Sequence, residues 1–363
     1  MNEIPSRASR SLVALAAGAL LSSCGGTALN ETPISAAGSK LAATAVAARP
    51  YVSLRRDHRR TWISPDIHRA RKVLFVSDVT AGDVDMFSLP DLTLKGTITG
   101  FAEPQGMCSD KNGNVWVADT GVARVYEYSH TGALLHTIRD GYGFPASCAI
   151  DPKNGHLTVL DIFVNAAPAL TSSTSGDWAP IQGFSCPSCR PVVKVVPGMF
   201  EIYFGGYDKR GDLYVDGFDL SGAVQVGAVP RGDDMGHELM LSGGKIYSPG
   251  MVQWYGRGRY LAVGDQECNG ESTSCIDWVS VSGTQAKIIG QTSLQTAQGS
   301  PVCDMVQSVL DPHGERKLLG GDYGGCSGAS SSVNRWRYPA GGLPIDSNAS
   351  AVQGPVGSAV SVK

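Results

Sequence analysis

The sequence has little net charge and no long apolar segment. Among its 363 residues, 30 Lys and Arg stand against 33 Asp and Glu, which leaves a net charge of -3, and only 17% of the residues are charged. Such a balance argues against a nucleic-acid-binding surface, which is normally basic. The apolar run from Leu12 to Leu21 is too short for a membrane-spanning helix. Composition does not change after about residue 60, so a single folded domain is expected.

Long helices are also unexpected, because 45 Gly and 20 Pro interrupt the chain. Instead, a short strand motif, here called the strand phrase, recurs along the chain. Asp-led turns that contain glycine, such as Asp110-Lys-Asn-Gly113 and Asp208-Lys-Arg-Gly211, precede several of its copies. The phrase is an apolar strand that ends in aspartate, at Asp78, Asp119, Asp161, Asp265 and Asp322. Self-similarity at a period of about 40 to 55 residues indicates one supersecondary unit repeated many times.

Each unit is consistent with four short antiparallel strands, and six units predict an all-β, six-bladed β-propeller over residues 51–363. The long interval between Asp161 and Asp265 must hold a blade around Leu213–Asp216, where Gly217 takes the usual Asp place, and either a bulge or a drifted repeat is expected. Either Trp62–Asp66 or Pro355–Ser361 could supply the strand that closes the ring.

The second unit carries the clearest family motif. Its residues are Glu103-Pro-Gln-Gly106, the segment from Asp110 to Asp119, and Arg124-Val125. This series resembles the NHL repeat, and residues 60 to 362 as a whole resemble NHL-like and gluconolactonase-like six-bladed propellers. The resemblance implies the fold more than the function, because propellers of this kind serve many roles.

The N-terminus has the order of an export signal. Arg7 and Arg10 precede the apolar run, and Leu21-Ser-Ser-Cys24 resembles the lipobox of bacterial lipoproteins. That resemblance implies a signal peptide at 1–23, removed by cleavage, and Cys24 as the lipidated residue that carries fatty acids such as palmitate. Residues 24–50 are small and polar, as expected of a disordered tether. An ordinary secretory signal is the alternative.

Eight further cysteines, an even number in an exported chain, favour disulfides. Spacing suggests the pairs Cys268–Cys275, Cys186–Cys189 and Cys108–Cys148, and elimination leaves Cys303 with Cys326. Spacing alone does not exclude other connectivities. The Cys186-Pro-Ser-Cys189 segment also leaves open a metal site or a redox site, although it lacks the helix start that a thioredoxin-like site needs.

The longest insertions follow the second strand of a blade, so the face where these strands end is the expected functional face. Asp78, Asp119, Asp161, Asp265, Asp322 and Glu103 are its candidate ligand-binding residues, and a ring of carboxylates could hold a divalent cation. The simpler alternative is that each Asp caps its own loop. A metal set of the gluconolactonase kind would need Glu103 and an asparagine such as Asn165, and His237-Glu238 is the best local acid–base pair.

Two functions agree with these features. The first is a membrane-anchored, extracytoplasmic lipoprotein whose propeller binds a protein or small-molecule ligand, and the second is a metal-dependent hydrolase or lyase of the lactonase type. We expect a monomer held by its lipid in the bacterial cell envelope, with no nucleic-acid partner. Gly25 stands where inner-membrane lipoproteins of enteric bacteria carry Asp, which favours the outer membrane.

Overall fold

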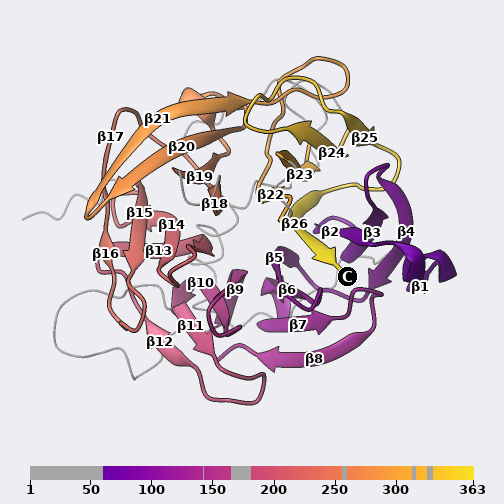
Figure 1. Cartoon of the computed structure of the whole chain (residues 1–363), viewed down its shortest axis with the longest axis horizontal. Helices are drawn as coiled ribbons and strands as arrows, with labels where there is room; N and C mark the ends of the chain where they lie inside the picture. Colours follow the sequence, from indigo (N-terminus) through magenta and orange to yellow (C-terminus); the bar gives the residue numbers. More distant parts are fainter. Residues whose placement is uncertain (1–59, 142, 165–180, 256–259, 313–315, 325–329) are drawn as a thin grey trace, which may run out of the picture. The chain divides into compact units, whose positions relative to one another are not determined.

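The computed structural model describes residues 60–363 except 142, 165–180, 256–259, 313–315 and 325–329. Several predictions fall on residues outside the described ones. These are the signal peptide (1–23), the tether (24–50) with Cys24, the first nine residues of the predicted domain (51–59), Asn165 and Cys326. Within the described part, six antiparallel sheets are arranged in a ring, and only three short 3-10 helices occur (Figure 1). The six-bladed all-β propeller predicted from the repeats is confirmed.

Blades 1 to 3 follow one another along the chain. Blade 1 has the order β1 (Trp62–Ile63), β4 (Thr93–Thr99), β3 (Asp83–Ser88), β2 (Lys72–Asp78) and β26 (Pro355–Val362). Blade 2 comprises β5 (Pro104–Ser109), β6 (Val115–Asp119), β7 (Arg124–Tyr128) and β8 (Leu134–Arg139). Blade 3 comprises β9 (Gly143–Ile150), β10 (Leu157–Val164), β11 (Ile181–Phe184) and β12 (Val192–Lys194).

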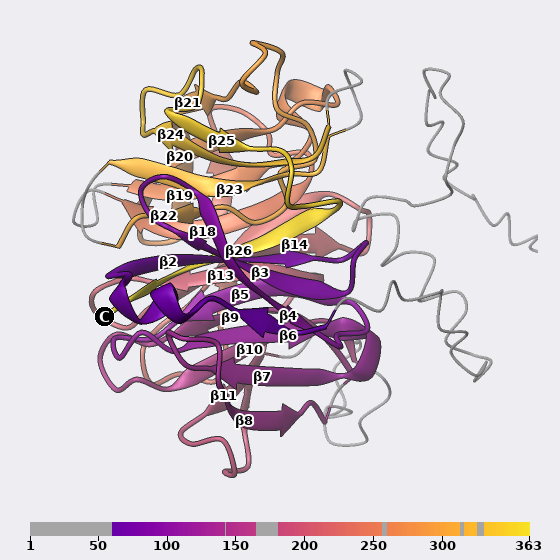
Figure 2. The same cartoon turned by 90° about the vertical axis from the view of Figure 1, so that its right-hand side faces the viewer.

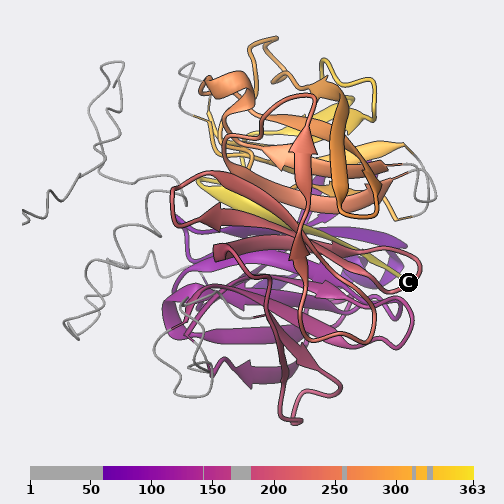
Figure 3. The same cartoon turned by 90° about the vertical axis from the view of Figure 1, so that its left-hand side faces the viewer.

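Blades 4 to 6 complete the ring, and blades 4 and 5 (red to orange) are seen from outside in Figure 3. Blade 4 comprises β13 (Met199–Tyr207), β14 (Leu213–Asp219), β15 (Val224–Val229) and β16 (His237–Glu238). Blade 5 comprises β18 (Pro249–Tyr255), β19 (Tyr260–Asp265), β20 (Cys275–Ser282), β21 (Gln285–Ser293) and an outer parallel strand, β17 (Met240–Ser242). Blade 6 comprises β22 (Val309–Leu310), β23 (Lys317–Asp322), β24 (Ser332–Arg337) and β25 (Asp346–Asn348). The 3-10 helices are η1 (Pro65–Arg69), η2 (Thr120–Val122) and η3 (Cys268–Gly270).

The second strands are apolar throughout because both of their faces are buried. Val73 and Phe75 of β2 pack in the core between blades 1 and 2, with Met107 and Val117. Leu74 and Val76 point the other way, into the core shared with blade 6. Successive side chains of a strand alternate between faces, so a strand with a neighbouring blade on each side needs hydrophobic residues at every position.

The C-terminal strand closes the ring. β26 forms the inner strand of blade 1 and pairs with β2 from Lys72–Val362 to Asp78–Pro355, as Figures 1 and 2 show. Trp62–Ile63, the other candidate, pairs with the outer strand β4 instead. The ring is thus closed by one late strand hydrogen-bonded to one early strand, and the inner edge of β2 is covered.

The glycine of the Pro-x-Gly motif is needed where inner strands of neighbouring blades converge. A Cβ atom at Gly106 would overlap Ser147 on β9, and one at Gly357 would overlap the carbonyl oxygen of Gln105 on β5. In blade 4, a Cβ at Gly217 would collide with the carbonyl oxygen of Glu201, and the pairing of β13 with β14 shifts register twice. The expected irregularity in this blade is therefore present, and it requires glycine at the usual Asp position.

No helix among the described residues is both long and apolar enough to cross a membrane.

Candidate functional site

The aspartates that end the second strands lie at one face of the ring, here called the Asp face. The carboxylate of Asp119 accepts hydrogen bonds from the backbone N–H groups of Ala102 (3.1 Å) and Glu103 (2.8 Å), just before β5. Asp78 accepts them in the same way from Gln353 (2.6 Å) and Gly354 (3.0 Å), just before β26. These bonds fasten the start of an inner strand to the end of its neighbour, which is the loop-capping role.

Blades 5 and 6 repeat this arrangement with small changes. Asp265 accepts bonds from Tyr247 N (3.1 Å), Ser248 N (3.0 Å) and Glu267 N (3.0 Å). Asp322 accepts them from Gly324 N (3.0 Å) and, at 3.3 Å, from Cys303 N. Four of the five candidate aspartates therefore accept hydrogen bonds from backbone amides, although Oδ2 of Asp322 has no partner among the described residues. A structural role accounts for their recurrence.

Asp161 departs from this pattern. It is fully buried and accepts a hydrogen bond from the side-chain amide of Gln182 (2.6 Å), which also donates to Asp140. Burial, and after it the carboxyl group of Asp140, raises the pKa of Asp161 well above its usual range. One amide therefore bridges two neighbouring carboxyl groups, that of Asp161 in blade 3 and that of Asp140, which follows the last strand of blade 2.

Further acidic groups occur near the starts of the inner strands. Burial raises the pKa of Glu103, and the charge of Asp119 adds to the effect. Asp304, before blade 6, has a left-handed backbone with a φ of 52°. Burial, and then the charge of Glu267, raises the pKa of Asp304 to about 6. Raised pKa values and unusual backbone geometry often coincide with function, so this face stays a candidate site.

The described residues do not gather a cation site around Glu103. Two groups of three side chains lie close enough to share a cation, namely Asp78, Asp83 and Asp85, and Asp265, Cys275 and Asp277. Glu103 belongs to neither group, and the sulfur of Cys275 is bonded to Cys268. Glu103 thus forms no such group with the described His, Cys, Asp and Glu side chains, and Asn165 lies outside the described residues.

Replacing Asp304 by Asn should stabilise the protein at neutral pH. The folded-state pKa of Asp304, about 6, exceeds the ordinary value of 3.8, so its ionisation costs stability as the pH rises between these values. Asn removes that cost and also tolerates a left-handed backbone. We expect a gain on the order of 1–3 kcal/mol near neutral pH and almost none in acid, measured by urea unfolding at both pH values.

Asp91→Asn is the matched control for this experiment, because hydrogen bonding, first from the Thr93 side chain, lowers the pKa of Asp91. Its replacement should destabilise the protein near neutral pH. If both variants lost the same free energy of unfolding near neutral pH, burial of the Asp304 carboxylate would not destabilise the protein.

A cavity of about 990 Å³ lies at the opposite face, here called the hairpin face, where turns join the inner and second strands. The inner strands of all six blades contribute to its wall, through Ser358 and Ala359, Met107–Ser109, Cys148–Ile150, Gly205–Tyr207, Met251–Tyr255, and Gln307, Val309 and Leu310. Most of these residues belong to the strand ends farthest from the aspartates, since Ser109 pairs with Val115 and Tyr207 with Leu213. The cavity is therefore the hairpin-face half of the central channel.

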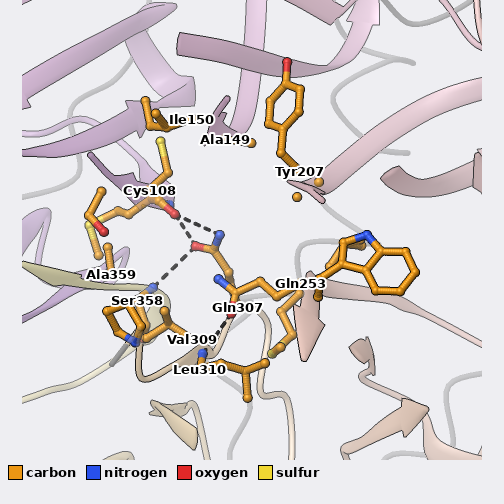
Figure 4. A pocket seen from close by; sticks show the side chains of 18 of the residues that line it. Cys108, Ala149, Ile150, Tyr207, Gln253, Gln307, Val309, Leu310, Ser358 and Ala359 are labelled. Atoms are coloured by element: carbon orange, nitrogen blue, oxygen red, sulfur yellow. Dashed lines mark hydrogen bonds between the residues drawn. The ribbon is translucent and has the colours of Figure 1, made fainter. Parts of the chain in front are cut away.

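Two glutamines stiffen the cavity wall (Figure 4). The side-chain oxygen of Gln307 accepts hydrogen bonds from Met107 N (2.7 Å) and Ser358 N (3.4 Å), and its nitrogen donates to Met107 O (3.0 Å). Gln253 accepts a bond from Leu310 N (2.8 Å). These bonds join blades 1, 2, 5 and 6 around the channel, so the wall is preorganised.

Sequence reasoning missed this cavity. Its wall consists largely of small and apolar residues, such as Ala149, Gly205 and Val309, that carry no motif. The one available signal was geometric, because a six-bladed ring must leave an axial channel.

The disulfides follow the expected pairs wherever both cysteines are described. Cys108–Cys148, Cys186–Cys189 and Cys268–Cys275 are bonded. Cys303 is also disulfide-bonded. Cys108–Cys148 lies in the cavity wall and joins the inner strands of blades 2 and 3. His237 and Glu238 form the outer strand β16, away from the channel, so they do not contribute to either candidate site.

Comparisons with known proteins agree with the fold. Residues 61–161 match the model of the SMP-30/Gluconolactonase/LRE-like region. No curated protein matches the chain. Together with the six-bladed ring, the family match supports a propeller of the NHL/SMP-30-like kind.

Solved structures show the same architecture. A Bacteroides caccae protein of unknown function aligns with a TM-score of 0.59 and 11% identity, over 81% of this chain and 100% of its own. A functionally unknown protein from Desulfotomaculum acetoxidans aligns with a TM-score of 0.50 and 10% identity, over 80% and 99%. Kuenenia stuttgartiensis hydrazine synthase aligns with a TM-score of 0.50 and 12% identity, over 76% and 80%. At such low identity these similarities show the fold alone.

Proposed function

We propose that this propeller is a lipid-anchored, extracytoplasmic binding protein that holds a small molecule in the hairpin-face cavity. The observation that carries the proposal is the cavity itself, which has a volume of about 990 Å³ and a wall built from all six blades. Ligand sites in proteins are usually preformed, concave and mostly apolar, with volumes up to about 1,000 Å³. The inner-strand wall is preformed and concave, and it combines apolar side chains such as Ile150 and Val309 with polar groups such as Gln253 and Gln307.

The cavity wall favours binding over chemistry. No histidine is among its described lining residues, and its one carboxylate, Asp311, is held by the Lys72 ammonium at 2.9 and 3.1 Å. Burial raises the pKa of Tyr207 to about 12, so its phenol stays protonated. An acid–base pair or an activated nucleophile is the usual requirement for hydrolysis, and the described wall offers neither.

A metal-dependent lactonase is less well supported. It would use the Asp face, where Glu103 has no partners for a shared cation among the described His, Cys, Asp and Glu residues. The aspartates of that face are engaged by backbone amides. We therefore assign no metal chemistry to the chain.

The proposed location rests on the Leu21-Ser-Ser-Cys24 motif and on the cysteines. Three described disulfides and the bonded Cys303 agree with folding in an oxidising compartment, such as the space outside the cytoplasmic membrane. A lipid at Cys24 would keep the propeller at the envelope, with the membrane as its first partner.

Filling the cavity should abolish ligand binding. We expect at least one of two aromatic fluorescent probes, neutral N-phenyl-1-naphthylamine or anionic 1-anilinonaphthalene-8-sulfonate, to bind the wild-type propeller at one saturable site. Ile150→Trp should weaken that binding at least about tenfold, because the larger ring occupies the cavity that Ile150 lines. Ser109→Trp fills the same space from blade 2 and guards against a folding defect in the first variant.

Ile289→Trp is the control, since Ile289 is 52% exposed on the outer strand β21. Saturable probe binding that neither cavity variant reduces, or no binding of either probe, would contradict the proposed site.

Changing Cys24 to Ser should release the protein from membranes. In cells given a clickable palmitate analogue, the wild-type chain should carry the label and sediment with the envelope, whereas the variant should do neither, because serine lacks the thiol that is acylated. Cys303→Ser is the control that keeps the lipobox. Label on the Cys24→Ser chain would contradict the anchor.

A further inference from the structure

The rim of the hairpin-face cavity carries three basic side chains. Lys209, Arg316 and Lys317 line the cavity. Lys209 and Arg316 are exposed and Lys317 is half-buried. Within the described part of the chain, none of the three forms an ion pair. Their charges are therefore available to a ligand.

Two described carboxylates close to these cations in the sequence, Asp311 and Asp208, already have partners. Asp311, in the wall itself, binds the Lys72 ammonium at 2.9 Å. Asp208, beside Lys209, accepts hydrogen bonds from Arg210 N (2.7 Å), Asp212 N (3.0 Å) and Arg210 Nε (2.9 Å). The described charged residues that line the cavity are three cations and the single carboxylate of Asp311, so the described rim has a net positive charge that favours an anionic ligand.

The two ends of the channel differ in sign. The Asp face carries several acids, among them Asp304, Asp322 and Glu267, and burial, followed by the charge of a neighbouring acid, raises the pKa of each. An anion is repelled there and attracted at the hairpin face. The described charges thus favour entry of an anion from the hairpin face.

Between the basic residues, the wall combines apolar side chains with polar groups. Ile150, Val309 and Tyr207 present hydrophobic surface, as Figure 4 shows. The side-chain nitrogen of Gln253 forms no hydrogen bond with the described residues, because its oxygen alone is used, by Leu310 N. A ligand with an apolar body and an anionic group would satisfy both regions.

From this arrangement we infer that the ligand is a small organic anion, whose carboxylate, phosphate or sulfonate lies at the basic rim that Lys209, Arg316 and Lys317 form and whose apolar body lies against the inner strands. The inference rests on the proposed function, since it names the ligand class of the same cavity.

The test compares two probes of similar shape that differ in charge, 1-anilinonaphthalene-8-sulfonate and neutral N-phenyl-1-naphthylamine. The sulfonate should bind the wild-type protein about tenfold more tightly than the neutral probe, and added salt should reduce this preference. The double variant Lys209→Gln/Lys317→Gln should lose about tenfold in sulfonate affinity and leave the neutral probe unchanged.

Lys111→Gln is the matched control, because Lys111 holds the same turn position after Asp110 as Lys209 does after Asp208, yet does not line the cavity. Both probes binding with equal affinity, or a control variant that loses as much sulfonate affinity as the double variant, would overturn the anion preference and leave the cavity site intact. Failure of both probes to bind would overturn the site and the inference together.

Discussion

Deleting residues 355–363 should abolish cooperative folding of the propeller. This deletion removes β26, which pairs with β2 over its whole length. It also removes Ala359 and Val360 from the cores on either side of blade 1, together with the Ser358 N–H group that binds Gln307. An open ring leaves the edge of β2 and two hydrophobic cores exposed to water. We expect no sigmoidal thermal transition by circular dichroism, and aggregation on purification.

Deletion of Lys363 alone is the control, because it removes only a terminal residue that follows the strand. A synthetic peptide of residues 353–363, added to the truncated chain, should restore part of the transition by supplying the missing strand. A truncated chain that unfolds cooperatively at nearly the wild-type temperature would show that the ring does not depend on this closure.

Removing the Cys108–Cys148 disulfide should cause the largest loss among the disulfides that the structure describes. The bond spans 40 residues and links two adjacent inner strands. The chain-entropy relation for a loop of this length gives about 4 kcal/mol of stabilisation. The double variant Cys108→Ala/Cys148→Ala should therefore unfold at a clearly lower urea concentration, with a loss of roughly this size in the free energy of unfolding.

Cys186→Ala/Cys189→Ala is the comparison, since that bond spans only three residues and the same relation gives about 2 kcal/mol. Both bonds should be intact in unreduced protein by mass spectrometry. Equal losses in the two double variants would contradict an effect governed by loop length.

The sequence predicted the structural elements that depend on residues close together in the chain. An apolar strand ending in Asp, after a turn such as Asp110–Gly113, is recognisable because strand alternation and turn chemistry act over a few residues. The short-range pairs Cys186–Cys189 and Cys268–Cys275 were readable for the same reason. Loop capping by Asp119 was also predicted, as the alternative to a cation-binding ring of carboxylates.

Other features depended on residues far apart. The choice between Trp62–Ile63 and Pro355–Val362 as the closing strand required knowledge of which edge of blade 1 faces the axis. The Asp161–Gln182–Asp140 contact joins two blades, and nothing in the repeat distinguishes Asp161 from the other aspartates.

The sequence by itself determined an all-β ring of six repeated units, because each unit encodes its strands and turns locally and cannot bury its two faces without neighbours. Only the tertiary structure decided where a ligand could bind. The hairpin-face cavity consists of one short stretch from each blade, and its basic rim joins Lys209 with Lys317 across more than one hundred residues. Such a site arises from the curvature of the closed ring, which no single repeat contains.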